Sequence, residues 1–113
     1  MAAFLSPSSA PPAAESWLEF ADFRPLFPLG QIVATPGALT ALYKAKTLPA
    51  HVLDRHAAGD WGDVPAVDAA ENALSLERGY RILSSYALET GARLWVITEA
   101  DRSVTTLLLP SEY

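Results

Sequence analysis

Two strongly apolar segments near the C-terminal end of the chain flank a short charged one. Residues 94–97 are Leu-Trp-Val-Ile and residues 104–109 are Val-Thr-Thr-Leu-Leu-Leu, while residues 99–102 carry Glu99, Asp101 and Arg102. Runs rich in β-branched and aromatic residues favour strands buried on both faces, and a short polar connection favours a hairpin turn. We therefore expect a β-hairpin over residues 93–109 with its charged turn in solvent.

An alternating segment precedes this hairpin. Tyr80, Ile82, Tyr86 and Leu88 share one side of a two-residue period, which predicts a strand over residues 80–88. The next residues, 89–91, end in Gly91, which accepts the positive φ of a tight turn. These strands predict an antiparallel meander, and a short strand over residues 31–34 extends it to a fourth.

Two helical patterns follow that short strand. Thr35 is a suitable N-cap, and Pro36 fits the first position of a helix. The apolar positions of this first helix are Leu39, Leu42 and Tyr43. Those of the second, expected over residues 48–58, are Leu48, Val52 and His56. Gly59 is placed to end the second helix in the left-handed conformation.

A third helical pattern completes the N-terminal part of the fold. Asp68 and Glu71 have the spacing of a capping box, and Gly79 is a stop signal. Its modest apolar stripe comprises Val67, Ala70, Ala73 and Leu74. With helices first and strands last, we expect an α+β two-layer sandwich, in which N-terminal helices pack on a C-terminal three- to four-stranded antiparallel sheet.

The first part of the chain differs in composition from the rest. Residues 1–16 are rich in Pro, Ala and Ser, which predicts a tail, and residues 17–113 are expected to form a single α+β domain. Aromatic residues recur at helical spacing just after the tail, at Trp17, Phe20, Phe23 and Phe27. They predict a short helix and a lid over the second face of the sheet, and a docking segment for a partner is the alternative.

Composition excludes several classes of function. The 113 residues carry a net charge of -5, which disfavours nonspecific binding to nucleic acid. The chain contains no Cys, and no run approaches the roughly 20 apolar residues that span a bilayer. The N-terminus lacks the basic start and long apolar centre of a secretory signal. We expect a cytoplasmic protein without a membrane contact, a cofactor or a metal.

One candidate site lies between the second and third helices. It comprises His56, Asp60, Trp61 and Asp63. Trp61 stands beside Gly62, so its indole is either a buried plug or an exposed anchor for a partner. Asp60 is a candidate charge partner for His56, and Asp63 is a candidate cap for the turn or helix that starts around residues 64–65. The spacing matches neither an EF-hand nor a zinc site, so we expect no metal.

The second candidate site is the hairpin turn, with Glu99, Asp101 and Arg102. Carboxylates on a solvated turn keep ordinary acidity, so they are poorly suited to acid–base chemistry near neutral pH. Asp101 can accept hydrogen bonds from the turn itself. Arg102 is then the better candidate for binding a carboxylate or phosphate of a partner.

No common catalytic motif is present. The sequence contains no phosphate-cradling Gly-rich loop, no nucleophile elbow and no HExxH zinc motif. A small hydrolase or nuclease would need His56 in a concave pocket with Asp60, Asp63 or Glu99. Packing of His56 beneath Trp61 would exclude that alternative.

Three segments together resemble a known family. They are residues 59–62, residues 72–86 and residues 95–103, and the likeness covers about residues 29–113. The segments resemble small uncharacterised bacterial proteins encoded on plasmids, prophages and other mobile elements, some loosely labelled as associated with type I restriction-modification. The resemblance implies no activity, cofactor or catalytic residue. It implies a setting in which small acidic proteins bind and block host defence complexes.

We therefore expect a noncatalytic protein-binding module of a mobile genetic element, with a host defence complex as a candidate partner and anti-restriction or anti-CRISPR inhibition as a candidate role. Its expected binding surface comprises Asp60, Trp61, Asp63, Glu99, Asp101 and Arg102. A structural homodimer, formed through a sheet edge or the aromatic segment, is a further alternative.

Overall fold

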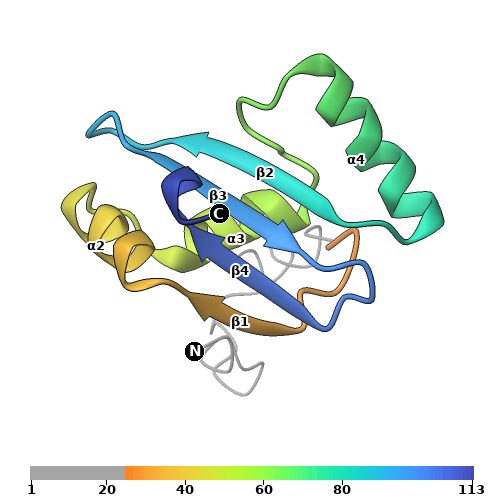
Figure 1. The fold of residues 1–113 in the computed structure, drawn as a ribbon, viewed down its shortest axis with the longest axis horizontal. Helices are drawn as coiled ribbons and strands as arrows, with labels where there is room; N and C mark the ends of the chain where they lie inside the picture. Colours follow the sequence, from red (N-terminus) through yellow and green to blue (C-terminus); the bar gives the residue numbers. More distant parts are fainter. Residues whose placement is uncertain (1–24) are drawn as a thin grey trace, which may run out of the picture.

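The computed structural model describes residues 25–113 and has the expected α+β architecture. The tail and the aromatic positions Trp17, Phe20 and Phe23 lie outside the described residues. The elements in chain order are β1 (Gln31–Ala34), α2 (Pro36–Lys44), α3 (Pro49–Ala57), α4 (Ala66–Arg78), β2 (Ile82–Ala87), β3 (Arg93–Thr98), β4 (Val104–Leu108) and the short 3-10 helix η3 (Pro110–Glu112), as Figure 1 shows.

The sheet is mixed, which corrects the expected antiparallel arrangement. Its strand order is β1-β4-β3-β2, and the two predicted hairpins pair β2 with β3 and β3 with β4 in antiparallel fashion. β1, however, runs parallel to β4, with Ile32 opposite Thr105. Parallel neighbours need a long crossover, and the helices and the other two strands between β1 and β4 supply it.

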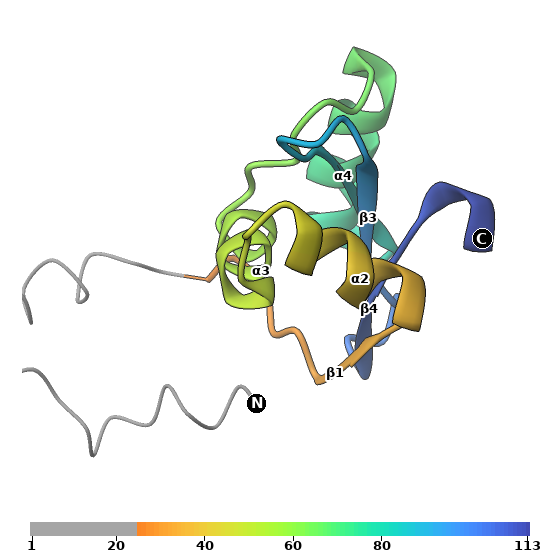
Figure 2. The same cartoon turned by 90° about the vertical axis from the view of Figure 1, so that its left-hand side faces the viewer.

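One face of the sheet carries the hydrophobic core. Figure 2 shows α2 and α3 on that side, with η3 on the opposite side. Buried side chains of both helices and of three strands form the cluster, and its largest members include Leu42, Val52, Tyr86, Leu94, Val96 and Leu107. Alternate residues of each strand face the helices, as the period of two predicts.

The first two helices follow the sequence signals except at their outer positions. Thr35 caps α2, because its hydroxyl oxygen accepts a hydrogen bond from the Ala38 amide at 3.0 Å. The buried positions of α2 are Ala38 and Leu42, whereas Leu39 and Tyr43, expected inside, are exposed. Ala38 is fully buried, so the side of α2 that packs on the sheet carries a small residue. The larger side chains of Leu39 and Tyr43 face outward.

Helix α3 buries Val52 and His56, as its pattern predicts. Leu48, expected on the same side, is exposed because it is the N-cap and precedes the helical turns.

Helix α4 departs most from its sequence pattern. It begins at Ala66 after Pro65, so the Asp68–Glu71 capping box does not form, and Asp63 does not cap it. Gly79 ends it with φ +76°, as predicted. Its buried positions are the polar Asn72 and Ser75.

The predicted apolar stripe of α4 is not packed into the core. Val67 is 67% exposed and Leu74 is 41% exposed, whereas Asn72 is buried. In Figure 1 the helix lies alongside β2. In Figure 2 it lies at the β2 edge of the sheet and not over the face that α2 and α3 cover.

The outer edge of β2 is closed by hydrogen bonds. The Asn72 side-chain amide donates to the Leu83 carbonyl at 2.7 Å and accepts from the Leu83 amide at 3.2 Å. Two positions further on, Ser85 donates to the Trp61 carbonyl and accepts from the Asp63 amide. A sheet edge with free backbone groups is a template for unwanted pairing, so these contacts protect β2.

Replacing the amide that closes this edge should destabilise the fold. Asn72→Ala leaves the Leu83 amide and carbonyl without their partner, at an expected cost of about 2 kcal/mol in the free energy of unfolding. Glu77→Ala, at an exposed position of the same helix, should change it by less than about 0.5 kcal/mol. Urea denaturation of both variants measures the difference, and equal stabilities would contradict a structural role for Asn72.

Candidate functional site

His56 lies in the interior of the protein. Its exposure is 0%, its Nδ1 lies 2.6 Å from the Ser84 hydroxyl, and its Nε2 lies 2.9 Å from the Thr98 hydroxyl. The two hydroxyls come from neighbouring strands β2 and β3, and the imidazole comes from α3. His56 therefore fastens a helix to the sheet through both ring nitrogens.

The hydroxyl chain beyond His56 determines where its proton sits. Thr105 donates its single hydroxyl hydrogen to the Leu29 carbonyl at 2.7 Å, so its oxygen accepts from Thr98, 2.7 Å away. Thr98 has then used its own hydrogen and must accept from Nε2 of His56. We therefore assign the Nε2–H tautomer, in which Nδ1 accepts from Ser84.

The buried position of His56 disfavours its charged form. Burial, with a smaller contribution from the positive charge of Arg102, lowers its pKa to about 4. The expected charge partner Asp60 is bonded to Arg55 instead. Ser84, which resembles a serine nucleophile beside its base, is itself fully buried and cannot meet a substrate.

An aromatic cluster covers His56. The Phe27 ring lies 5.2 Å from the His56 ring, 6.3 Å from the Trp61 ring and 5.6 Å from the Arg102 guanidinium carbon, while Trp61 lies 6.0 Å from His56. Trp61 is only partly buried, so it acts as a plug on one side and is accessible on the other. Phe27, expected in a lid on the second face, packs on the helix side with His56.

The two aspartates beside Trp61 already have basic partners. Asp60 binds Arg55 at 2.6 Å and accepts from the Gly62 amide at 3.2 Å. The hydrogen bond from Arg55 is the main cause that lowers the Asp60 pKa. Asp63 lies 3.6 Å from Arg93 across β2. These contacts shape the loop and leave both carboxylates at the surface.

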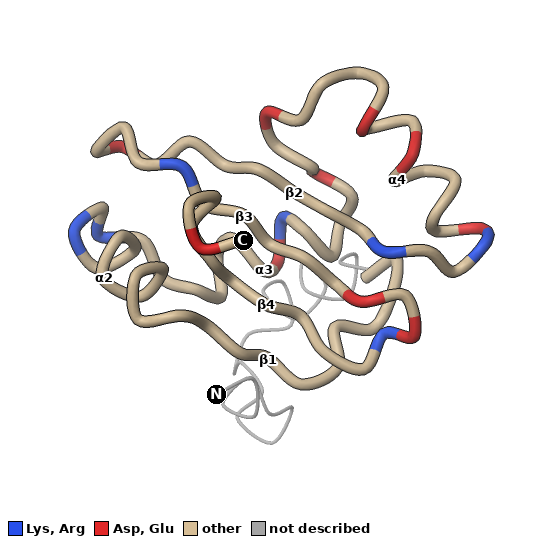
Figure 3. Tube along the Cα trace, viewed as in Figure 1, with Lys and Arg blue, Asp and Glu red and all other residues tan. Residues whose placement is uncertain are grey.

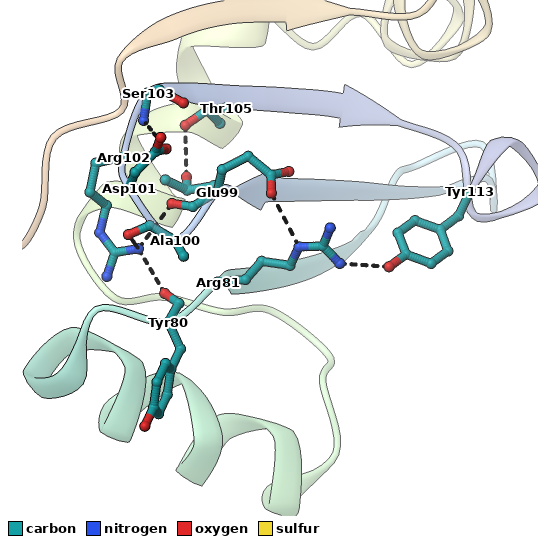
Figure 4. A network of polar contacts seen from close by, with 10 residues as sticks. Tyr80, Arg81, Glu99, Ala100, Asp101, Arg102, Ser103, Thr105 and Tyr113 are labelled. Carbon is teal, nitrogen blue, oxygen red and sulfur yellow. Dashed lines mark hydrogen bonds and ion pairs between the residues drawn. The ribbon is translucent and has the colours of Figure 1, made fainter.

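Arg102 ties the β3–β4 turn to the end of α4, as Figure 4 shows in part. With φ +61° at this position, its guanidinium donates to the carbonyls of Ser75 and Tyr80 at 3.0 and 2.7 Å. It also donates to two carbonyls of its own turn. β2 begins at Ile82 and not at residue 80, where the backbone carbonyl accepts from Arg102 and the amide donates to Ser75.

The acids of the same turn are also engaged. Glu99 lies 3.5 Å from Arg81, which donates to the Tyr113 hydroxyl at 2.6 Å (Figure 4). Asp101 accepts from the Ser103 amide at 3.0 Å, and hydrogen bonds from the Ser103 side chain and backbone lower its pKa. The binding role expected of Glu99, Asp101 and Arg102 stays a prediction.

The two predicted constellations are joined by α4. Asp63 lies shortly before its first residue, Ala66, and Arg102 binds the carbonyl of Ser75 near its end. Trp61 and Arg102 also contact the same Phe27 ring. The loop before α4 and the β3–β4 turn thus both lie next to α4 and Phe27. Most contacts of each candidate site are nevertheless made within that site.

A groove between α4 and the start of β2 was not predicted from the sequence. It has a volume of about 430 Å³ and is lined by Asp68, Glu71, Asn72, Leu74, Ser75, Tyr80, Arg81 and Leu83. Periodicity identified the α4 stripe but assigned it to the core. Asn72 attaches another side of α4 to the sheet through Leu83, and periodicity does not indicate such a contact.

No metal site or membrane-crossing element is found among residues 25–113. In this part of the chain no group of at least three His, Asp or Glu side chains has a metal-binding arrangement. None of its helices has the length and apolar character needed to cross a bilayer. Comparison with protein-family models, with curated proteins and with solved structures finds no match for this chain. The family resemblance therefore stays a prediction.

The buried imidazole should make stability depend on pH. The unfolded chain binds a proton at His56 near pH 6.5 and the folded one only near pH 4, so the unfolded state takes up more protons between these values. The neutral imidazole of His56 should contribute fully to the free energy of unfolding above pH 6.5. This free energy should fall by about 3 kcal/mol on acidification to pH 4. Urea denaturation between pH 7 and 4.5 measures this decrease.

The control is His51→Gln, which leaves His56 as the only imidazole. This variant should show the same loss of stability. Titration of its remaining imidazole by NMR should give a midpoint near 4. A midpoint near 6.5 would show that His56 is not held neutral in the interior.

Proposed function

We propose that the protein is a noncatalytic protein-binding module that binds its partner through the outward side of α4. The observation that carries this proposal is the orientation of the helix. Asn72 and Ser75 face inward, while Val67 and Leu74 face solvent. Exposed apolar side chains cost free energy unless another surface covers them, so a helix held in this orientation is suited to docking.

The positions of the chemical groups support binding over catalysis. His56 is fully buried beneath the aromatic rings, and its nitrogens contact hydroxyls. The candidate carboxylates Asp60, Asp63 and Glu99 pair with three different arginines. A hydrolase would need an accessible base close to one of these acids, an arrangement that the described residues do not provide.

The mobile-element setting is a proposal that rests on the family resemblance. In that setting the partner is a host defence complex, and the module inhibits restriction or CRISPR interference by occupying a functional surface. The net charge of -5 supports a basic partner surface. Trp61, with Asp60 and Asp63, borders the start of α4 and is proposed to form the margin of the same interface.

A matched pair of variants tests the role of α4. Val67→Ser combined with Leu74→Ser removes the outward apolar side chains, and Leu39→Ser combined with Tyr43→Ser removes two exposed on α2. In capture experiments from a host expressing restriction and CRISPR systems, the α4 variant should bind its partner at least about tenfold more weakly. The α2 variant should bind as the unchanged protein does.

Thermal melting should show that both variants fold. Equal capture by the unchanged protein and a folded α4 variant would contradict the proposal. Capture of this chain alone, with a dimer mass by light scattering, would support the structural homodimer instead.

A further inference from the structure

We infer that the groove between α4 and β2 receives a helical segment of the partner that combines apolar side chains with Lys or Arg. The inference rests on the proposed function and specifies its partner chemistry. It concerns the groove bordered by Asp68, Glu71 and Leu74 of α4 and by Tyr80 and Leu83 on the strand side.

The groove offers an apolar contact surface of suitable size. Leu74 is 41% exposed, Tyr80 is 52% exposed, and Leu83, which also lines the groove, is partly buried. Its volume of about 430 Å³ falls in the range of roughly 300–1,000 Å³ that is usual for ligand pockets. Apolar side chains of a partner would cover these surfaces and gain the free energy of their burial.

The charge on the groove selects a basic partner. Asp68 and Glu71 line it together from one side of α4, and neither forms an ion pair within residues 25–113. Arg81 also lines the groove, but Glu99 offsets its charge and the Tyr113 hydroxyl accepts one of its hydrogen bonds. The net charge of the residues that line the groove is therefore negative. Figure 3 shows that acidic positions recur along α4.

Backbone pairing favours a helical partner over an extended one. An extended peptide would bind β2 by adding a strand to its outer edge. Asn72 already occupies the edge at Leu83, and residues 61–63 occupy it at Ser85. Recognition must therefore occur through side chains, as it does when an amphipathic helix lies in a groove.

The same charge disfavours two other occupants. A second copy of the chain that docked through the same groove would place its own Asp68 and Glu71 near those of the first. Residues 1–24 carry Glu15, Glu19 and Asp22 against Arg24 alone, so they are also net acidic. Like charges that approach closely lower the affinity, so a separate basic partner fits the groove best.

Three designed peptides test this inference on the full chain. They share one amphipathic helical pattern of Leu and Ala and carry Lys, Gln or Glu at every polar position. Amide chemical shifts of the isotope-labelled protein report both the site and the affinity. The Lys peptide should shift Leu74, Tyr80 and Leu83, bind most tightly, and weaken as salt is raised.

Neutral isosteres separate charge from shape. Asp68→Asn combined with Glu71→Gln should weaken the Lys peptide about fivefold and leave the Gln peptide unchanged. Glu89→Gln is the control, because Glu89 is an exposed acid that lines a different groove, beside α3. It should bind all three peptides as the unchanged protein does.

Several results would overturn the inference. They are equal affinity for the three peptides, shifts confined to other parts of the protein, no shifts at millimolar peptide, or concentration-dependent shifts of the same residues without peptide. If one occurs while the α4 serine variant still loses its captured partner, the partner chemistry is wrong and the binding module stands. If the Lys peptide binds as expected but capture does not depend on α4, the proposed function fails instead.

Discussion

The arrangement of this protein depends on a pair of hydrogen bonds between the Asn72 side chain and the backbone of Leu83. A helix beside a sheet ordinarily docks through an apolar stripe, and its polar side then faces water. Here an amide in the middle of α4 takes the place of a neighbouring strand and satisfies both backbone groups of the edge residue. Because the attachment is polar, the apolar positions Val67 and Leu74 need not face the sheet. The protected edge and the exposed apolar side of α4 thus have one cause.

A second set of polar contacts joins the helix layer to the sheet. It also limits the chemistry that His56 can perform. The imidazole of His56 spans from α3 to hydroxyls of β2 and β3, and the chain continues through Thr105 to the Leu29 carbonyl. Every hydroxyl in this chain needs a defined direction, so only one neutral tautomer fits. A histidine used in this way orders the core at the expense of reactivity. The same residue types on an open surface would have indicated catalysis, whereas buried and mutually bonded they indicate a structural role.

The sequence predicted elements more reliably than their orientation. The hairpin around residues 99–102 and the ends of the helices at Thr35 and Gly79 depend on local chemistry, so local patterns were sufficient. The direction of β1 depends on where a distant strand lies, which a four-residue segment does not encode. The stripe of α4 was recognised, but periodicity shows only that a helix has two sides. Which side faces inward was decided by Asn72 and the unpaired edge it meets, a long-range contact without a local signal.

The distinction between paired and unpaired acids bears on which surface can bind. Asp60, Asp63 and Glu99 lie near arginines, so a partner cation must compete with an existing contact before it gains a new one. Asp68 and Glu71 have no such contact among the described residues, so within residues 25–113 no existing ion pair competes with a partner cation. Charged clusters on a loop and a turn are conspicuous in the sequence, yet their charges largely serve the fold. The less conspicuous acids of α4 line the groove together with the exposed Leu74, and this combination of acidic and apolar surface supports the proposed docking of a partner there.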